Sequence, residues 1–242
     1  WTCRTGRADL PKIRGTGSGA GSQLSDASGS LIPVGVFGGT FNPVHYGHLR
    51  SALELVGHLD LESLRLMPCA QPPHREAPHC SPHHRAAMVE LAVSGEPRLR
   101  CDDRELQRDG PSYTIDSLIE LRQELGTQGS LAMVVGCDAL LHIASWHRWQ
   151  ELLDWAHIAV IARPGWELPT QGEVATWVAE HRAKDADCLR QRSSGSVLVE
   201  ELRPLDISST EIRAMLTAGE SPRYLLPEAV MDYIQTHRLY QQ

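Results

Sequence analysis

Short apolar runs alternate with amphipathic helical patterns along most of this chain, and the alternation limits its possible folds more than any other feature. Runs of strand length occupy residues 34–37, 64–67, 99–101, 131–135, 158–162 and 197–202. Apolar residues repeat at helical spacing over residues 45–56, 82–94, 115–125, 208–216 and 227–237. Because strands that alternate with helices become parallel neighbours joined by right-handed crossovers, the sequence predicts an α/β fold with a doubly wound parallel sheet. Functional residues are expected at the carboxyl ends of its strands.

The first 32 residues do not share this pattern. Residues 15–30 contain ten glycines and serines among sixteen positions. Such a segment buries too little apolar surface to offset the entropy that is lost on ordering. We therefore expect residues 1–32 to form a flexible tail and residues 33–242 to form one domain, whose length and composition suffice for a full core.

Charge and composition argue against several classes of protein. The chain carries a formal net charge of −7, which disfavours a nucleic-acid-binding protein. No apolar run reaches about 18 residues, and no secretory signal is visible, so we expect no membrane association. The six cysteines form no C-x-x-C pair and are expected to be reduced thiols of a cytoplasmic protein. With only two lysines present, phosphate groups have to bind to arginine, histidine or backbone amides.

Residues 38–48 read G-G-T-F-N-P-V-H-Y-G-H, and this string has the layout of a phosphate site. A buried strand ends in a glycine pair, and a helix with free N–H groups begins near His45. His45 and His48 are three residues apart, so both rings project from the same side of the first helical turn. Gly47 removes a side chain that would crowd a phosphate. These donors suit a phosphorus centre in displacement; the alternative is a glycine turn followed by two incidental histidines.

A second string, I-S-S-T-E-I-R at residues 207–213, lies far downstream. Ser208 or Ser209 at a helix start supplies a cap and N–H donors, and Arg213 adds a two-pronged donor for phosphate oxygens. Alone, this string predicts an ordinary capped helix. Together with the first string it predicts a nucleotide site.

The two strings resemble the signatures of the nucleotidyltransferase superfamily of adenylyl and cytidylyl transferases, in which the first contains H-x-G-H. Intermediate segments are similar to the branch of bacterial nicotinate-nucleotide adenylyltransferases, with Arg75 where lysine is common. These segments are Q-P-P-H-R at 71–75, S-Y-T-I-D at 112–116, G-C-D at 136–138, W-H-R-W at 146–149, R-P-G at 163–165 and Y-L-L-P at 224–227. The resemblance implies a Rossmann-like nucleotidyltransferase fold. It also implies transfer of AMP from ATP to nicotinate mononucleotide, with deamido-NAD and pyrophosphate as products.

The resemblance also assigns roles on the ATP side. It implies that the catalytic residues are His45, His48 and Arg213, which face the ATP phosphates and the transition state. The remaining ATP-binding residues would be Gly38, Gly39, Thr40, Phe41, Gly136, Asp138, Ser208, Ser209 and Thr210. Mg²⁺ would accompany ATP as co-substrate, bound mostly by phosphate and water rather than by a protein cage.

On the acceptor side, Trp146 is expected to stack on the pyridine ring, and the segment at Thr114 to receive the nicotinate carboxylate. The full set implied for nicotinate mononucleotide is Asn42, His74, Arg75, Thr114, Ile115, Trp146 and His147. Core packing is the alternative for Trp146, and a helix N-cap is the alternative for Thr114.

Other functions stay open at this point. The acceptor could be nicotinamide mononucleotide or another phosphate compound, or the chain could sense ATP without catalysis. A Rossmann dehydrogenase is disfavoured because no G-x-G-x-x-G follows the first strand. The histidine-rich stretch over residues 74–84 fits no closed zinc pattern, so no protein metal site is expected. A homo-oligomer is compatible with the sequence.

Overall fold

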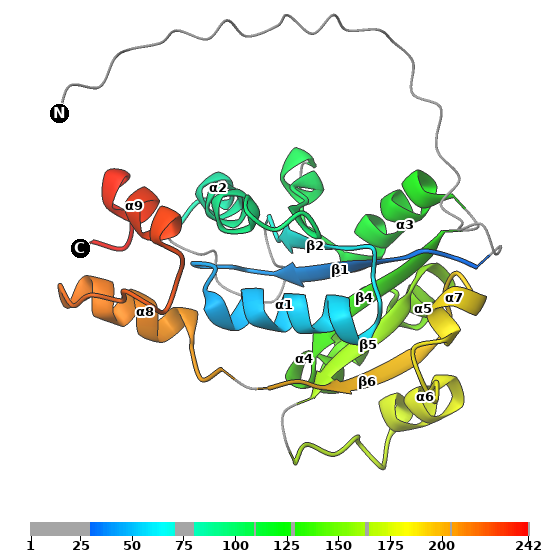
Figure 1. The fold of residues 1–242 in the computed structure, drawn as a ribbon. Helices are drawn as coiled ribbons and strands as arrows, with labels where there is room; N and C mark the ends of the chain where they lie inside the picture. Colours follow the sequence, from blue (N-terminus) through cyan, green and yellow to red (C-terminus); the bar gives the residue numbers. More distant parts are fainter. Residues whose placement is uncertain are drawn as a thin grey trace, which may run out of the picture.

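The computed structural model describes residues 30–70, 80–108, 110–126, 129–162, 165–203 and 205–241. Six strands form one sheet in the order β3-β2-β1-β4-β5-β6 (Figure 1). They are β1 (Pro33–Gly39), β2 (Ser63–Pro68), β3 (Leu99–Cys101), β4 (Ser130–Gly136), β5 (His157–Ala162) and β6 (Val197–Glu201). Each neighbouring pair is parallel, so the predicted doubly wound sheet is confirmed. The direction of winding reverses between β1 and β4, and such sheets bind ligands at that point.

Helices cover both faces of the sheet. The α-helices are α1 (Tyr46–His58), α2 (Pro82–Val93), α3 (Thr114–Leu125), α4 (Cys137–Leu141), α5 (Leu152–Trp155), α6 (Glu173–His181), α7 (Cys188–Gln191), α8 (Ser209–Thr217) and α9 (Glu228–Thr236). Turns of 3-10 helix cover Arg104–Gln107, Ile143–Ser145 and Trp149–Glu151. Within the described ranges, no helix has the length and apolar character that crossing a membrane requires.

The strands contribute side chains to two separate cores, because successive strand residues point to opposite faces of the sheet. Ala132 and Val134 of β4 join the cluster that contains α1, α2, α8 and α9, which we call the α1 core. Met133 and Val135 of the same strand join the cluster packed by α3, α4, α5 and α6, which we call the α3 core. The alternation along β4 explains why its sequence is apolar at nearly every position.

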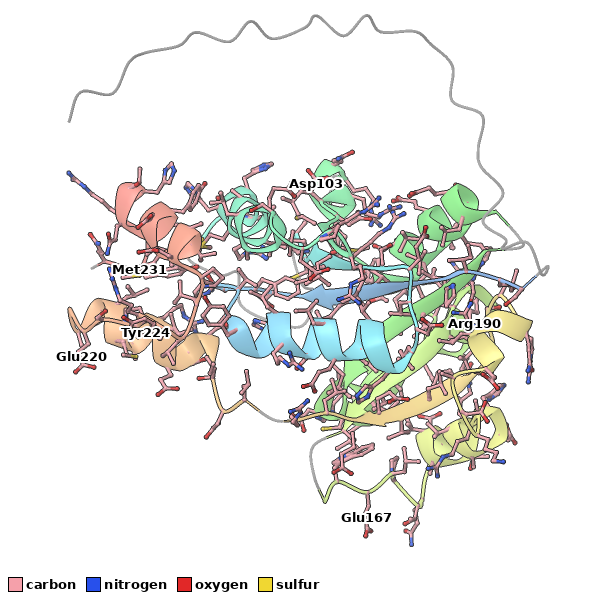
Figure 2. The ribbon with its side chains drawn as sticks, viewed as in Figure 1. Asp103, Glu167, Arg190, Glu220, Tyr224 and Met231 are labelled. Carbon is pink, nitrogen blue, oxygen red and sulfur yellow. The ribbon has the colours of Figure 1, made fainter. Side chains whose placement is uncertain are left out.

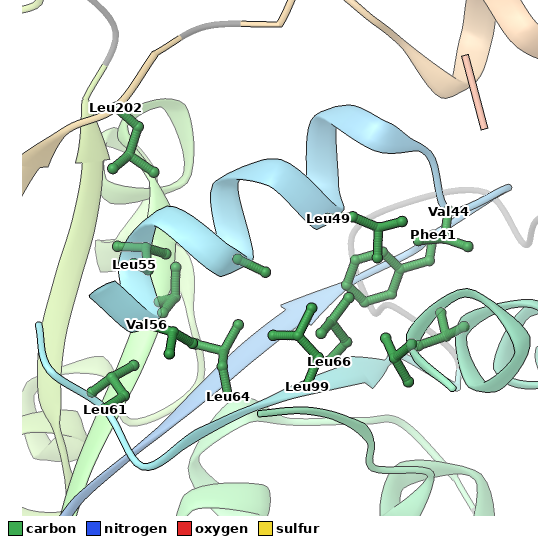
Figure 3. Packing of buried hydrophobic residues seen from close by; sticks show 14 of the residues in the cluster. Phe41, Val44, Leu49, Leu55, Val56, Leu61, Leu64, Leu66, Leu99 and Leu202 are labelled. Carbon is green, nitrogen blue, oxygen red and sulfur yellow. The ribbon is translucent and has the colours of Figure 1, made fainter. Parts of the chain in front are cut away.

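The loop between β1 and α1 is anchored in the α1 core by its own side chains. Phe41 and Val44 lie outside any helix or strand, yet they are buried beside Leu49 and Leu66 (Figure 3). A Cβ atom on Gly39 would lie 2.8 Å from Cζ of Phe41, so the close approach of this ring requires glycine there. We call residues 40–45 the motif loop.

The sequence placed two parts of the chain incorrectly. Leu31 was assigned to the tail, but it is buried and its N–H donates to the carbonyl of Arg190 (3.1 Å), so the fold includes it. Residues 1–29 lie outside the described ranges. No helical range was assigned between β4 and β6, where α4 to α7 are found; α4, α5 and α7 have only four or five residues each, which is too short for a helical period.

The two ends of the sheet differ in what surrounds them. Figure 2 labels Arg190 at the amino end of β1, far from Glu220 and Met231, which lie beside α8 and on α9. Helices α8 and α9 thus stand at the carboxyl end of β1, next to the motif loop (Figure 1). The fold therefore brings the carboxyl-terminal helices to the edge where a ligand is expected.

Candidate active site

The two histidines of the first string stack on each other. The ring centroids of His45 and His48 are 3.8 Å apart with an interplanar angle of 30°, as their spacing predicts. The backbone N–H of His45 donates to Nδ1 of His48 (3.4 Å), so a neutral His48 ring carries its proton on Nε2. A Cβ atom on Gly47 would lie 2.9 Å from Nδ1 of His45. Glycine at 47 therefore makes room for the His45 ring, whereas the sequence analysis explained it by room for a phosphate.

Burial keeps both rings uncharged. It lowers the pKa of His45 to about 4. It lowers the pKa of His48 to about 3, and repulsion from His45 adds to that effect. Near pH 7 the pair is therefore neutral before a ligand binds, and each ring can still donate one hydrogen bond. Nδ1 of His45 is buried and has no hydrogen-bond partner among the described residues.

The first turn of α8 is fastened to the motif loop. Ser208 is the N-cap residue, because its Oγ accepts the N–H of Glu211 (3.1 Å). Ser209 Oγ donates to the carbonyl of Pro43 (2.9 Å). Nη1 of Arg213 donates to the carbonyl of Asn42 (2.7 Å), and its Nη2 donates to Thr210 Oγ1 (3.3 Å). The two strings, far apart in sequence, therefore meet in space.

A cavity of about 750 Å³ opens at the carboxyl ends of β1 and β4. Eight of the residues expected to bind substrate line it: Gly38, Gly39, Thr40, Thr114, Gly136, Asp138, Trp146 and His147. This position coincides with the point where the winding of the sheet reverses, as the fold class predicts. The ATP-side and acceptor-side candidates thus share one cavity.

The other candidates do not line this cavity. The side chains of Phe41 and Ile115 are buried in the α1 and α3 cores, so only their backbone can meet a ligand. Asn42 Oδ1 accepts the hydroxyl of Tyr240 (2.6 Å). His45 is the last residue of the motif loop, and His48, Arg213 and the Ser208–Thr210 turn lie next to that loop. His74 and Arg75 lie outside the described residues.

The structure bears differently on the N-cap alternative for Thr114 and on the core-packing alternative for Trp146. Thr114 is the first residue of α3 and Tyr113 is its N-cap, so an N-cap role for Thr114 is wrong. Trp146 lines the cavity and also packs against the α3 core, so packing and contact with a ligand are compatible. Trp149 and Trp155 pack against the same core. The ring of His147 lies 4.6 Å from that of Tyr113.

Arg85 is an important residue that the sequence analysis missed. Its side chain is completely buried, and Nη1 donates to the carbonyl of Thr40 (2.7 Å). Nη2 donates to the carbonyls of Cys69 (2.6 Å) and Ala70 (3.2 Å). The guanidinium therefore ties the motif loop to the segment after β2. The sequence signal was a charged residue in phase with the buried Met88 and Val89 of α2.

Glu105 and Ser117 also line the cavity and were given no role from the sequence. Ser117 Oγ donates to Glu105 Oε1 (2.9 Å) and accepts from Nη2 of Arg108 (2.5 Å). This network connects the segment before α3 to the first turns of that helix. No local pattern in the sequence predicts it, because Glu105 and Arg108 lie in and directly after the 3-10 turn Arg104–Gln107, whereas Ser117 lies in α3.

A parallel sheet that carries a glycine-rich loop and a helix N-terminus at its reversal point is the architecture of a nucleotide-binding α/β protein. The sequence pattern of the cytidylyltransferase-like family matches residues 36–215. A relative from Cellvibrio japonicus, named probable nicotinate-nucleotide adenylyltransferase, is 48% identical over 207 residues, with coverage of 86% of this chain and 98% of the relative. A relative of the same name from Pseudomonas aeruginosa is 47% identical and covers 86% of this chain and 96% of its own length.

Among solved structures, nicotinic acid mononucleotide adenylyltransferase of Plasmodium falciparum, complexed with NaAD, matches with a TM-score of 0.66. The match covers 86% of this chain and 97% of that chain at 17% identity, so it bears on the fold alone. The chain belongs to the cytidylyltransferase-like family, and within it to the nicotinate-nucleotide adenylyltransferases.

Replacing Arg85 by methionine should lower the free energy of unfolding by about 2–4 kcal/mol, because the carbonyls of Thr40, Cys69 and Ala70 lose their donor while buried. Urea denaturation followed by circular dichroism measures this change. Arg98→Met is the matched control, since Arg98 is half exposed and should change stability by less than about 0.5 kcal/mol. Equal effects of the two substitutions would contradict the anchoring role.

The buried histidines also predict how stability depends on pH. Between about pH 6.5 and pH 4 the unfolded chain binds more protons at His45 and His48 than the folded chain does, so stability falls as the pH falls. Each histidine contributes up to about 1.4 kcal/mol per pH unit. His48→Gln should therefore flatten the loss of unfolding free energy between pH 7 and pH 4.5 in urea titrations. His58→Gln, at the exposed end of α1, is the control; an unchanged slope in His48→Gln would disprove the assignment.

Proposed function

We propose that this protein transfers the adenylyl group of ATP to the phosphate of nicotinate mononucleotide and releases pyrophosphate. The product is nicotinate adenine dinucleotide, also called deamido-NAD. The observation that carries the proposal is the joining of the stacked His45–His48 pair to the first turn of α8, next to a large cavity at the sheet edge. The family relationship supports the same reaction.

The reaction needs no nucleophile from the protein. A phosphate oxygen of the mononucleotide attacks the α-phosphorus of ATP, and the bond to the β-phosphate oxygen breaks, so pyrophosphate leaves with the electron pair. Negative charge moves onto the leaving group and the equatorial oxygens during this step. Positioning of the two substrates and stabilisation of that charge supply most of the rate.

On the ATP side, His45 and His48 donate hydrogen bonds to the phosphates and the transition state. Their burial supports this role, because a donor in a low-dielectric site stabilises developing charge more than one in water. Arg213 and the Ser208–Thr210 turn hold the β- and γ-phosphates at the N-terminus of α8. Gly38, Gly39 and Thr40 border the phosphates, and Gly136 and Asp138 contact the adenosine.

Magnesium enters with ATP as the Mg·ATP substrate. No group of three or more His, Cys, Asp or Glu side chains that could hold a metal ion occurs in the described residues. Mg²⁺ usually keeps several waters and binds through substrate phosphates, so it does not need such a group. The ion neutralises charge on the phosphates while the chain's own donors align them.

On the acceptor side, the N-terminus of α3 receives the nicotinate carboxylate. Thr114 lines the cavity and Ile115 follows it, so the free backbone N–H groups and the helix dipole suit an anion there. Trp146 stacks on the pyridine ring, with His147 beside it. Asn42, His74 and Arg75 complete the set that the family resemblance implies. A cytoplasmic location, a homo-oligomer and the absence of nucleic-acid binding stay predictions.

Pyrophosphate release from Mg·ATP tests the proposal, with nicotinate mononucleotide and nicotinamide mononucleotide compared side by side. Strong preference for the nicotinate compound is expected, because nicotinamide lacks the charge that the α3 terminus binds. Equal use of both acceptors would retain adenylyl transfer and reject the carboxylate site. Absence of release with either acceptor would reject the proposed reaction.

His45→Ala in the same assay should lower kcat by about 10²–10³-fold, the usual loss for one donor to developing charge. His58→Ala removes an exposed histidine from the last turn of the same helix and should leave kcat unchanged. Unchanged turnover in His45→Ala would refute the role of the stacked pair.

A further inference from the structure

Asn42 is the only asparagine in the chain, and both of its acceptor oxygens are occupied by distant residues. Its backbone carbonyl accepts from Nη1 of Arg213 on α8 (2.7 Å). Its side-chain Oδ1 accepts from the hydroxyl of Tyr240, in the segment after α9 (2.6 Å). Asn42 belongs to the first sequence string, whereas Tyr240 lies outside both strings.

Tyr240 is itself held firmly in place. Its backbone adopts the left-handed region at φ +61°, which an aromatic residue rarely occupies. Its carbonyl accepts from Thr217 Oγ1 at the end of α8 (3.3 Å), and its ring packs against the α1 core. Burial and the neighbouring Cys80 thiol raise the pKa of the phenol far above its usual value, so its hydroxyl stays protonated.

The bond to Oδ1 favours one orientation of the Asn42 amide. An asparagine side chain offers one acceptor oxygen and two N–H donors on opposite sides of the amide, and the two orientations have nearly the same shape. A phenol that donates to Oδ1 favours the orientation in which the NH₂ group points away from Tyr240. The motif loop thereby gains a side-chain donor whose orientation is set before a ligand binds.

We propose that Tyr240 is a positioning residue of the transfer site, which orients the Asn42 amide so that its NH₂ group donates to an oxygen of the acceptor nucleotide. This inference rests on the proposed function and adds a residue that the family strings do not contain. It gives the segment after α9 a part in acceptor binding. If Tyr240 only fastened the end of the chain to the domain, its hydroxyl would affect stability alone.

Because Asn42 is the only asparagine, its amide can be observed without turnover. Protein labelled with asparagine carrying ¹⁵N in the side chain gives one pair of amide resonances in NMR. In Tyr240→Phe these resonances should move and exchange faster with water. Tyr233→Phe is the matched control, because that hydroxyl bonds to His84 on α2 (2.9 Å) and should leave the Asn42 signals in place. Unmoved signals in Tyr240→Phe would overturn the proposal.

Kinetics then test the consequence. Tyr240→Phe should lower kcat/KM for nicotinate mononucleotide about 5–30-fold, while KM for ATP changes less than about 2-fold. Asn42→Ala should lower it at least as much. In the Asn42→Ala background the Tyr240→Phe substitution should have no further effect, because it acts only through that amide.

Two results would overturn the proposal. The first is a double variant whose loss of kcat/KM equals the product of the two single losses. The second is a rise of KM for ATP and for nicotinate mononucleotide by the same factor in Tyr240→Phe. Thermal unfolding of each variant identifies any loss caused by instability. If wild-type protein fails to turn over, the proposed function fails, whereas the NMR comparison still decides whether Tyr240 sets the amide.

Discussion

The insertion of Phe41 and Val44 into the α1 core is the constraint on which the site depends, because it fixes a loop that has no regular structure of its own. With these two side chains buried, the carbonyls of Thr40, Asn42 and Pro43 take fixed positions. Arg85 of α2 donates to the first of them, and Arg213 and Ser209 of α8 donate to the second and third. The loop therefore satisfies buried backbone acceptors without a ladder of its own, and α2 and α8 dock onto it as a result.

The same contacts shape the electrostatics of the site. Two guanidinium groups, on Arg85 and Arg213, donate to carbonyls of the motif loop, and neither forms an ion pair with a carboxylate among the described residues. Positive charge therefore collects at the carboxyl edge of β1 in a chain whose net charge is −7. The neutral His45 and His48 add oriented donors without adding charge repulsion. The phosphate groups proposed to bind there would meet a local charge opposite to the net charge of the whole protein.

The sequence predicted the sheet and the meeting of the two strings, because both follow from local patterns and from the handedness of βαβ connections. A sequence motif identifies a residue but does not say whether its side chain or its backbone meets the ligand. The side chains of Phe41 and Ile115 belong to the cores, so only their backbone groups can reach a ligand. Arg85 was overlooked because a buried arginine contradicts its usual place at the surface. The contact between Asn42 and Tyr240 joins residues 198 apart, and no periodicity reports such a pair.

Different hydrogen bonds hold the β1 side and the α3 side of the cavity in place. The β1 side is held by the motif loop and by contacts from α2, α8 and Tyr240. The α3 side is held by Glu105, Arg108 and Ser117, none of which forms a hydrogen bond with that loop in the described structure. Substitutions in the proposed acceptor wall at α3 therefore need not disturb the donors proposed for ATP. Asn42 is the exception, because it belongs to the ATP-side loop yet is proposed to bind the acceptor, and through it the two halves are coupled.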